Sequence, residues 1–286
     1  MKTVYIEKND PFTTLTTWLY CSLHMAYAAE KMGFIPYINW HNGVQYYNDP
    51  TMFAKQPNQF EWYFKQPFIE KPHRDETWTW ESQGWGANVE TSKFQLMNEP
   101  LKTIKDFYKK NLIFNESTNA IGESLVKKYN IDFSKTIGIT WRGTDNVTDG
   151  RPRMPIETYY PFIDEILTKN PDFRIMCTAE EQSILEPLFK RYPQAFNIDE
   201  FVSSPLKSKH NPERLGSRSG YEKGLQPALM VWMFSKCAHY IKNRSSTGAV
   251  ASWLSNGRIV CLGHEETLSY NLAYDYVEIE GKKYPL

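Results

Sequence analysis

The stretch KTIGITWRGTDNVTDGRP, residues 135–152, contains a short apolar strand pattern that ends at a single arginine. TIGITW predicts a buried strand, and Arg142 and Gly143 then open a small polar loop. The sequence IETYYPFIDEILTKN, which follows the loop, has the spacing of a helix. A strand that leads through a loop into a helix is the repeating unit of an α/β sheet, so this stretch indicates the fold class.

The same alternation continues along the C-terminal half of the chain. FRIMC, HYIKN and RIVCLG predict strands, and AEEQSILEPLFKRYP, GLQPALMVWMFSKC and STGAVASWLSN predict helices between them. Strands and helices at this spacing predict a parallel, doubly wound sheet. Ligands of such sheets bind beyond the carboxyl ends of the strands, and Arg142 is expected at one of those ends.

The N-terminal half opens with a β-α-β pattern. TVYIE predicts a strand, LTTWLYCSLHMAYAAEKMG a helix that Gly33 can end, and FIPYINW a second strand. Residues 41–95 are rich in Asn, Gln, Pro, Trp and Tyr and have poor periodicity, which predicts a long irregular insertion of the kind that is more often functional than idle. Helical spacing returns in MNEPLKTIKDFYKKNLIF, and Ser117 is expected to cap the next helix, TNAIGESLVKKYN.

We therefore predict an α/β protein of two domains, with a boundary between residues 130 and 134. The N-terminal domain, residues 1–132, contains the Trp-rich insertion, and the C-terminal domain, residues 133–286, contains the regular α/β pattern. The last residues of the chain could pack back on the N-terminal domain.

Composition narrows the class of protein. The 286 residues have a formal net charge of zero, which argues against bulk binding to nucleic acid or to an anionic membrane. No N-terminal signal and no apolar run long enough to cross a bilayer are visible, so we expect a soluble cytoplasmic protein. The four cysteines, Cys21, Cys177, Cys237 and Cys261, form no close CxxC pair, which argues against a zinc knuckle. Cys177 and Cys261 lie in the apolar runs FRIMC and RIVCL, and we expect them to be buried free thiols.

Two positions at the expected ligand edge suit an anion. The guanidinium of Arg142 is a planar fork of donors for phosphate, and Gly143 lets a ligand approach the backbone; alternatively Arg142 pairs with Asp145 to brace the loop. A helix start after the strand HYIKN would direct backbone N–H groups at an anion, although ordinary N-capping by one of its serines needs no ligand. The residues of this helix start are Ser245, Ser246 and Thr247.

Three further features are weaker candidates. Glu180 or Glu181 could bind a sugar or base, or Glu181 could form a capping box with Thr178. Arg214 and Arg218 could close over a diphosphate or lie in a solvated loop. A tryptophan cluster could form a platform for sugar rings or a local mini-core, and its members are Trp78, Trp80 and Trp85. The chain has no HExxH, Walker or GxSxG motif, and we predict no metal site.

Three stretches resemble signatures of the α-1,6-fucosyltransferases and of protein O-fucosyltransferase-like enzymes. ITWRGTDNVTDGRPRMPIETYYPFIDEI is similar to the first signature, CTAEEQSILEPLFKRYP to the second and MFSKCAHYIKNRSSTGAVASWL to the third, in the same order. The resemblance covers about the C-terminal half of the chain. AAEKMGFIPYINW also looks like the opening of small glycosyltransferases of this superfamily.

The resemblance implies a GT-B enzyme, with two Rossmann-like domains facing a central cleft. It implies an inverting, metal-independent transfer of a sugar, best guess fucose from GDP-fucose, to a glycan hydroxyl. The N-terminal domain would hold the acceptor and the C-terminal domain the nucleotide sugar. The family's β-phosphate-binding arginine falls on Arg142 and its acid on Asp145. The second-signature acids fall on Glu180 and Glu181, and the serines on Ser245 and Ser246.

The chain departs from the first signature at several positions. Thr140, Gly143 and Asn146 replace a histidine, an arginine and a lysine, and Gly150 stands where the catalytic glutamate is expected, beside Asp149. An acid expected before the third signature is Met230. The catalytic base could therefore be Asp149, Asp145 or an acid of the N-terminal domain.

Two other functions remain open beside GDP-fucose transfer, and a third lacks its motif. The same fold could use another donor such as UDP-xylose. A non-catalytic glycan-binding protein on a decayed transferase scaffold is a second alternative. A nucleotide-sugar epimerase or dehydrogenase would need a GxGxxG after the first strand, and NDPFTTLTTW offers no glycine there.

Overall fold

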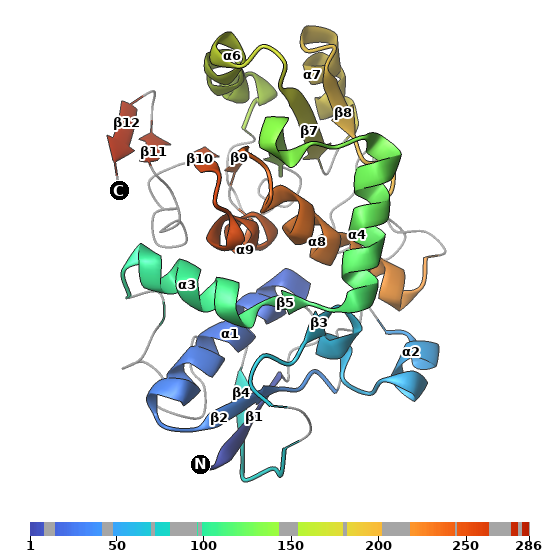
Figure 1. Cartoon of the computed structure of the whole chain (residues 1–286), viewed down its shortest axis with the longest axis vertical. Coiled ribbons are helices and arrows are strands. Elements are labelled where there is room, and N and C mark those ends of the chain that lie inside the picture. Colours follow the sequence, from blue (N-terminus) through green and yellow to red (C-terminus); the bar gives the residue numbers. More distant parts are fainter. Residues whose placement is uncertain are drawn as a thin grey trace. The chain divides into compact units, whose positions relative to one another are not determined.

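The computed structural model describes residues 1–8, 15–41, 48–69, 72–80, 96, 99–142, 154–179, 182–201, 218–243, 245–262, 276–279 and 282–285 (Figure 1). The chain forms two compact units. Unit 1 comprises Met1–Gly122 and Arg218–Leu229, and unit 2 comprises Glu123–Ser217 and Met230–Leu286. The chain first passes from unit 1 to unit 2 after Gly122, ten residues before the expected boundary at 132/133. The segment Arg218–Leu229 belongs to unit 1 again.

Unit 1 contains a three-stranded parallel sheet of order β2-β1-β4. Its elements are β1 (Thr3–Lys8), α1 (Leu15–Lys31), β2 (Ile35–Ile38) and β4 (Glu76–Trp80). Helix α1 is buried from Leu15 to Ala29 because it packs on the sheet as its covering helix. Gly33 ends the helix region with φ +80°, a conformation that glycine adopts without a Cβ penalty.

The rest of unit 1 is made of short elements. They are α2 (Pro50–Lys55), η2 (Gln59–Trp62), β3 (Phe64–Lys65), α3 (Leu101–Asn111), β5 (Ile113–Phe114) and the first part of α4 (Glu116–Tyr129). Strands β3 and β5 pair antiparallel. The prediction that Ser117 caps α4 is wrong: Asn115 Oδ1 accepts the Thr118 N–H at 2.8 Å, and Ser117 lies inside the first turn.

Unit 2 contains a seven-stranded sheet of order β12-β11-β10-β9-β6-β7-β8, parallel except for the β11–β12 pair. Its strands are β6 (Thr136–Trp141), β7 (Arg174–Ala179), β8 (Ala195–Asn197), β9 (His239–Asn243), β10 (Arg258–Leu262), β11 (Tyr276–Ile279) and β12 (Lys282–Pro285). The six parallel strands, taken in chain order, have the order 3-2-1-4-5-6 of a Rossmann-type sheet. The predicted doubly wound sheet is confirmed.

The second part of α4 and η5 (Phe133–Lys135) lead into β6. The helices that connect the parallel strands are η6 (Ile156–Tyr159), α6 (Tyr160–Lys169), η7 (Gln182–Ile184), α7 (Leu185–Arg191), the second part of α8 (Gly220–Phe234) and α9 (Ser246–Leu254). Figure 1 shows α6 and α7 on one face of the sheet and α9 on the other, as right-handed crossovers in opposite directions require. The core includes Ile137, Ile139 and Ile241 of the central strands.

The two ends of the described C-terminal part belong to different units. Strands β11 and β12 extend the sheet of unit 2. The segment that returns to unit 1 is the start of α8. Tyr221 stacks on Tyr63 with ring centroids 5.5 Å apart, and its N–H donates to Asp49 Oδ2 at 3.2 Å. These contacts join residues far apart in the sequence, so a local pattern does not reveal them.

Cys177 and Cys261 are buried and free, as predicted, and Cys21 and Cys237 are buried and free as well. Within the ranges given above, no helix is long and apolar enough to cross a membrane.

Candidate functional site

The carboxyl ends of β6 and β9 form the topological switch point of the sheet in unit 2. The strand that follows β6 in the chain, β7, pairs on one side of it, and the strand that follows β9, β10, pairs on the opposite side. In open α/β sheets, ligands bind beyond the carboxyl ends of the strands at such a point, where the connections from two neighbouring strands leave in opposite directions. The candidate site is built at this point.

Arg142 is the first residue after β6 and its backbone is fixed to β9. Its N–H donates to Asn243 Oδ1 at 2.9 Å, and Asn243 Nδ2 donates to the carbonyl oxygen of Arg142. The last backbone pair of β6 and β9 joins Thr140 to Lys242. One residue further on, the side-chain amide of Asn243 bonds to the backbone of Arg142 in place of a backbone pair. Asn243 is only 4% exposed, whereas Arg142 is partly exposed, so a buried amide holds an accessible guanidinium at the edge.

One hydrogen bond joins the described residues on either side of the stretch 143–153. Trp141 is buried and its Nε1–H donates to the carbonyl oxygen of Met154 at 2.9 Å. Met154 therefore lies beside the end of β6. Three predicted site residues of this loop lie outside the described residues, namely Gly143, Asp145 and Asp149.

Helix α9 begins next to Arg142, directly after β9. Ser245 is its N-cap, with extended backbone, and Ser245 Oγ accepts the Gly248 N–H at 2.9 Å. The capping alternative is confirmed for Ser245, and Ser246 and Thr247 occupy the first turn. A hydroxyl that accepts one hydrogen bond still carries a proton to donate, so the cap and an anion contact are compatible. The N-terminus of this nine-residue helix carries partial positive charge.

Lys242, which is not among the predicted site residues, lies against the N-terminal turn of α9. Lys242 on β9 is fully buried, and desolvation lowers the pKa of its ammonium group. A Cβ added to Gly248 would stand 2.7 Å from Lys242 Cδ and 2.8 Å from Ser245 Oγ, so the lysine stem runs against the first turn of α9. An anion at the helix N-terminus would favour the charged form of Lys242.

Buried hydroxyl groups hold β6 and β9 together beneath the site. Tyr159 OH donates to the carbonyl oxygen of Thr140 at 3.0 Å, and the Thr140 and Tyr240 hydroxyls lie 2.9 Å apart. Burial raises the pKa of both tyrosines, so these groups stay neutral and serve as hydrogen-bond partners. Thr140, at the signature's histidine position, is therefore part of the support under the site.

The backbone of Arg142 lies beside Asn243, two residues before the helix cap Ser245, since β6 and β9 are neighbours. Arg218 lies in unit 1, just before α8, and Glu180 lies outside the described residues. Sequence reasoning missed Asn243 and Lys242. The available signal was a lysine and an asparagine at the end of the strand HYIKN, where a buried strand meets the predicted ligand edge.

The tryptophan cluster is described only in part. Trp78 on β4 is 2% exposed and packs edge-on against Phe34, with ring centroids 5.4 Å apart. Its ring offers no open face, which favours the mini-core alternative for this residue. Trp80 ends β4, and nothing further is described of its side chain; Trp85 lies outside the described residues.

The described residues hold no group of three or more His, Cys, Asp or Glu side chains that could bind a metal ion. Positive potential at this edge comes from Arg142 and from the N-terminus of α9, whereas desolvation favours the uncharged form of the buried Lys242. An arginine and a helix N-terminus suit a phosphate or diphosphate.

Comparison with known proteins identifies the fold. No protein-family model and no curated protein sequence matches the chain. Among solved structures, NodZ α-1,6-fucosyltransferase soaked with GDP-fucose is similar, with 14% identity and a TM-score of 0.52 over 91% of this chain and 94% of that chain. Fucosyltransferase NodZ from Bradyrhizobium gives 13% identity and a TM-score of 0.51 over 91% and 94% of the two chains.

A third similar structure is Arabidopsis thaliana FUT1 in complex with GDP, with 8% identity and a TM-score of 0.53 over 91% of this chain and 70% of that chain. At these identities the likeness concerns the fold. The chain has the GT-B fold, with Rossmann-like architecture, and the predicted fold class is confirmed.

Proposed function

We propose that this protein is a glycosyltransferase that moves a sugar from a nucleoside-diphosphate donor to a glycan hydroxyl. The observation that carries the proposal is the convergence of Arg142 and the N-terminus of α9 at the switch point of a GT-B fold. GDP-fucose is our best assignment of the donor, because structures of the same fold are described with GDP and with GDP-fucose and because the signatures resemble fucosyltransferases.

The proposed reaction is a direct displacement that inverts the anomeric carbon. The acceptor hydroxyl loses its proton to a base, its oxygen forms the new bond to the anomeric carbon, and the bond to the β-phosphate oxygen breaks. The departing electron pair leaves negative charge on the diphosphate. The Arg142 guanidinium and the first turn of α9 would stabilise that growing charge, which would make them transition-state contacts. No metal takes part in this proposal.

The other donor-side residues enter the proposal in supporting roles. Ser245, Ser246 and Thr247 would contact the diphosphate, and Asn243 would hold Arg142 in place. Gly143, Glu180 and Arg218 remain proposed donor contacts. Asp149 and Asp145 remain candidate bases.

A second donor is supported by one specific observation. Thr140 occupies the signature's histidine position, and its hydroxyl is engaged with the buried Tyr240 beneath the sheet edge. Because the Thr140 hydroxyl is bonded to Tyr240, we propose that Thr140 does not recognise the nucleotide base or the sugar. A donor with another base and sugar, such as UDP-xylose, would then fit the same phosphate site. The diphosphate is the part common to both donors.

The test is a thermal-shift panel of the full chain with GDP, UDP, CDP, ADP and no nucleotide. A ligand that binds only the native state raises the melting temperature by mass action. We expect one diphosphate to give a shift that Arg142→Ala abolishes. Arg191→Ala is the matched control, because Arg191 ends α7 and pairs with Asp164 at 2.7 Å. No shift with any nucleotide would contradict the donor site and favour the glycan-binding alternative.

Transfer itself is measured as release of the identified diphosphate from its nucleotide sugar, with a panel of oligosaccharide acceptors. We expect Arg142→Ala to lower kcat by at least about 10²-fold, the usual loss when one preorganised donor to a developing charge is removed. An Arg142→Ala enzyme with unchanged turnover would refute the leaving-group role.

A further inference from the structure

Lys242 lies in the middle of the sheet of unit 2 and is 0% exposed. It is the fourth residue of β9, paired on one side with Thr140 of β6 and on the other with Cys261 of β10. Lysine is among the residues that are least often fully buried, because burial removes the hydration of its ammonium group. A fully buried lysine at the ligand edge of a sheet therefore needs an explanation beyond packing.

The stem of Lys242 runs along the first turn of α9. A Cβ added to Gly248 would stand 2.7 Å from Lys242 Cδ. The same Cβ would stand 2.8 Å from Oγ of Ser245, the cap of the helix. A single methylene carbon separates Cδ from the ammonium nitrogen, so that nitrogen lies close to the start of α9. Any residue larger than glycine at position 248 would push the lysine stem or the helix cap aside.

The groups that share a face of the sheet with Lys242 are thiol and hydroxyl groups. Thr140 and Cys261 are on this face because residues paired across strands point to the same side. Tyr240 is on it too, two residues earlier on β9, and its hydroxyl lies 2.9 Å from that of Thr140. Burial raises the pKa of Tyr240, which therefore stays neutral. Desolvation lowers the pKa of Lys242 and outweighs the opposite effect of the Cys261 thiol.

The positive groups at this edge act in the same direction as desolvation. The N-terminus of α9 carries partial positive charge, and Arg142, the first residue after β6, adds a full charge at the edge. Positive charge nearby disfavours the ammonium form of a lysine. The empty site therefore favours Lys242 as a neutral amine.

A diphosphate at this edge would reverse that balance. An opposite charge within about 4–6 Å of an ionisable group favours its charged form. Buried lysines change their pKa readily, and an ammonium group binds phosphate as a point charge. A negatively charged ligand at the start of α9 would thus draw a proton onto Lys242.

We propose that Lys242 is uncharged at about pH 8 in the empty protein and takes up a proton when a nucleoside diphosphate binds at the N-terminus of α9. The amine nitrogen bonds a proton from solvent through its lone pair, and the ammonium group balances one charge of the diphosphate. The proton returns to solvent when the diphosphate leaves. This assignment rests on the proposed function for its ligand, and all the residues that it uses belong to unit 2.

Proton uptake is measured by isothermal titration calorimetry of the full chain with GDP, UDP, CDP and ADP. Each titration is made in Tris and in HEPES at about pH 8, where the terminal phosphate is ionised. The difference in heat between two buffers of different ionisation enthalpy gives the number of protons taken up. We expect about one proton per bound nucleotide for the wild type and none for Lys242→Met, whose apolar side chain is similar in length.

The same coupling makes the affinity depend on pH. Because the complex holds one proton more than the empty protein, the wild-type Kd should rise by up to about tenfold between about pH 7.5 and 8.5. Lys242→Met should bind about 5- to 150-fold more weakly at the lower pH, without such a rise.

Lys236→Met is the matched control. Burial lowers the pKa of Lys236 as well, but this lysine precedes the amino end of β9, at the other end of the strand. Its ammonium group lies 3.3 Å above the Trp232 ring and 3.7 Å from Glu123 Oε1. We expect this variant to keep the wild-type affinity, pH dependence and proton uptake.

The charge of Lys242 in the empty protein is read by NMR of a chain labelled with ¹⁵N-lysine. An amine and an ammonium nitrogen differ in chemical shift, and loss of the signal in Lys242→Met assigns it. We expect the amine shift without nucleotide and the ammonium shift when the nucleotide that binds is added to saturation.

The outcomes separate this proposal from the proposed function. If none of the four nucleotides binds to the wild type, the donor site is contradicted and the coupling with it. If a nucleotide binds without proton uptake, or if Lys242 is already an ammonium in the empty protein, the role of Lys242 is overturned and the donor site stands. Uptake that is lost in Lys242→Met and kept in Lys236→Met supports it. If Lys242→Met does not fold, Lys242→Leu replaces it.

Discussion

Gly248→Ala adds one methyl group to the first turn of α9. The new Cβ would stand 2.7 Å from Lys242 Cδ, 2.8 Å from Ser245 Oγ and 3.2 Å from Tyr240 OH. Two non-bonded carbon atoms attract at about 3.5 Å, so the contact with Lys242 is about 0.8 Å too close. The lysine stem is buried and Ser245 is the helix cap, so neither atom is the loose end of an exposed chain.

The free-energy change follows from three contributions. Overpacking of this kind costs about 1–3 kcal/mol, and displacing the Ser245 cap costs about 1 kcal/mol. Alanine is a better helix former than glycine by about 1 kcal/mol, and this gain offsets the free energy lost with the Ser245 cap. The net expectation is a loss of about 1–3 kcal/mol of local stability, which corresponds to about 5- to 150-fold more frequent opening.

The assay is hydrogen exchange of peptides that cover α9, read by mass spectrometry, because a chain of two compact units does not guarantee a single unfolding transition. Exchange should accelerate by the factor given above. Lys242→Ala removes the first contact, so Gly248→Ala should cost less in that background. Slower exchange in Gly248→Ala, as helix propensity alone predicts, or an equal cost in both backgrounds, would refute the reasoning.

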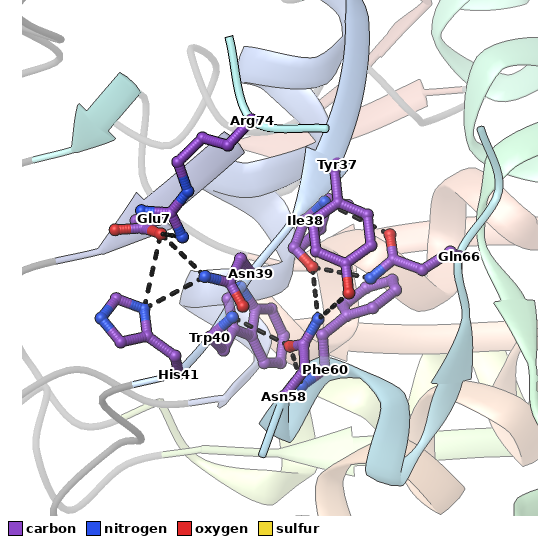
Figure 2. Close-up of polar contacts among 10 residues, drawn as sticks. All are labelled: Glu7, Tyr37, Ile38, Asn39, Trp40, His41, Asn58, Phe60, Gln66 and Arg74. Carbon is purple, nitrogen blue, oxygen red and sulfur yellow. Dashed lines mark hydrogen bonds and ion pairs between the residues drawn. The ribbon is translucent and has the colours of Figure 1, made fainter. Parts of the chain in front are cut away.

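Three further predictions concern other buried groups. Asn243→Ala removes both hydrogen bonds to the Arg142 backbone, so we expect about 1–3 kcal/mol of lost stability and a smaller nucleotide-induced thermal shift; an unchanged shift would contradict the anchoring role. Asn58 accepts the Trp40 N–H and donates to the carbonyl oxygen of Ile38, to which Gln66 also donates (Figure 2). Asn58→Ala should cost a similar amount, about 1–3 kcal/mol, in urea unfolding, and native-like stability would show that Gln66 alone holds β2. Burial lowers the pKa of His24 to about 3, so the unfolded state binds more protons below pH 6.5 and stability falls as pH decreases toward 3. Between pH 6.5 and 5 the loss should be about 2 kcal/mol in urea titrations, and His24→Met should lack it; equal pH slopes would exclude His24 as the cause.

The strands and helices of unit 2 were predictable because each has a complete local pattern. TIGITW and RIVCL are short, mostly apolar runs bounded by polar residues, and the helices between the strands show apolar spacing. That β6 and β9 are neighbours was not predictable in the same way, because strand order depends on packing between elements far apart in sequence. The expectation that Arg142 and Ser245 lie at one edge came from the ligand rule for open sheets and from the resemblance.

The parts that could not be predicted depend on long-range contacts. The sequence predicts Asn243 only as the last residue of a strand. Its two hydrogen bonds to the Arg142 backbone depend on β6 lying beside β9. Glu7 reads as a polar strand end, and its partner Arg74 is far along the chain in a segment without periodicity. Ser117 and Asn115 are both good capping residues, and the backbone path at the end of β5 decides in favour of Asn115.

Helix α8 has a consequence for how the gene could recombine. Its first part, with Tyr221 and Gly224, belongs to unit 1, and its last part belongs to unit 2. Tyr63 OH donates to the carbonyl oxygen of Tyr221, and a Cβ at position 224 would stand 2.2 Å from that hydroxyl. A chimera that exchanges everything after residue 122 therefore imports a foreign α8 onto the resident Tyr63. Such an exchange is expected to succeed only with parents that carry a glycine at position 224. The segments before and after residue 122 therefore cannot be exchanged independently of each other.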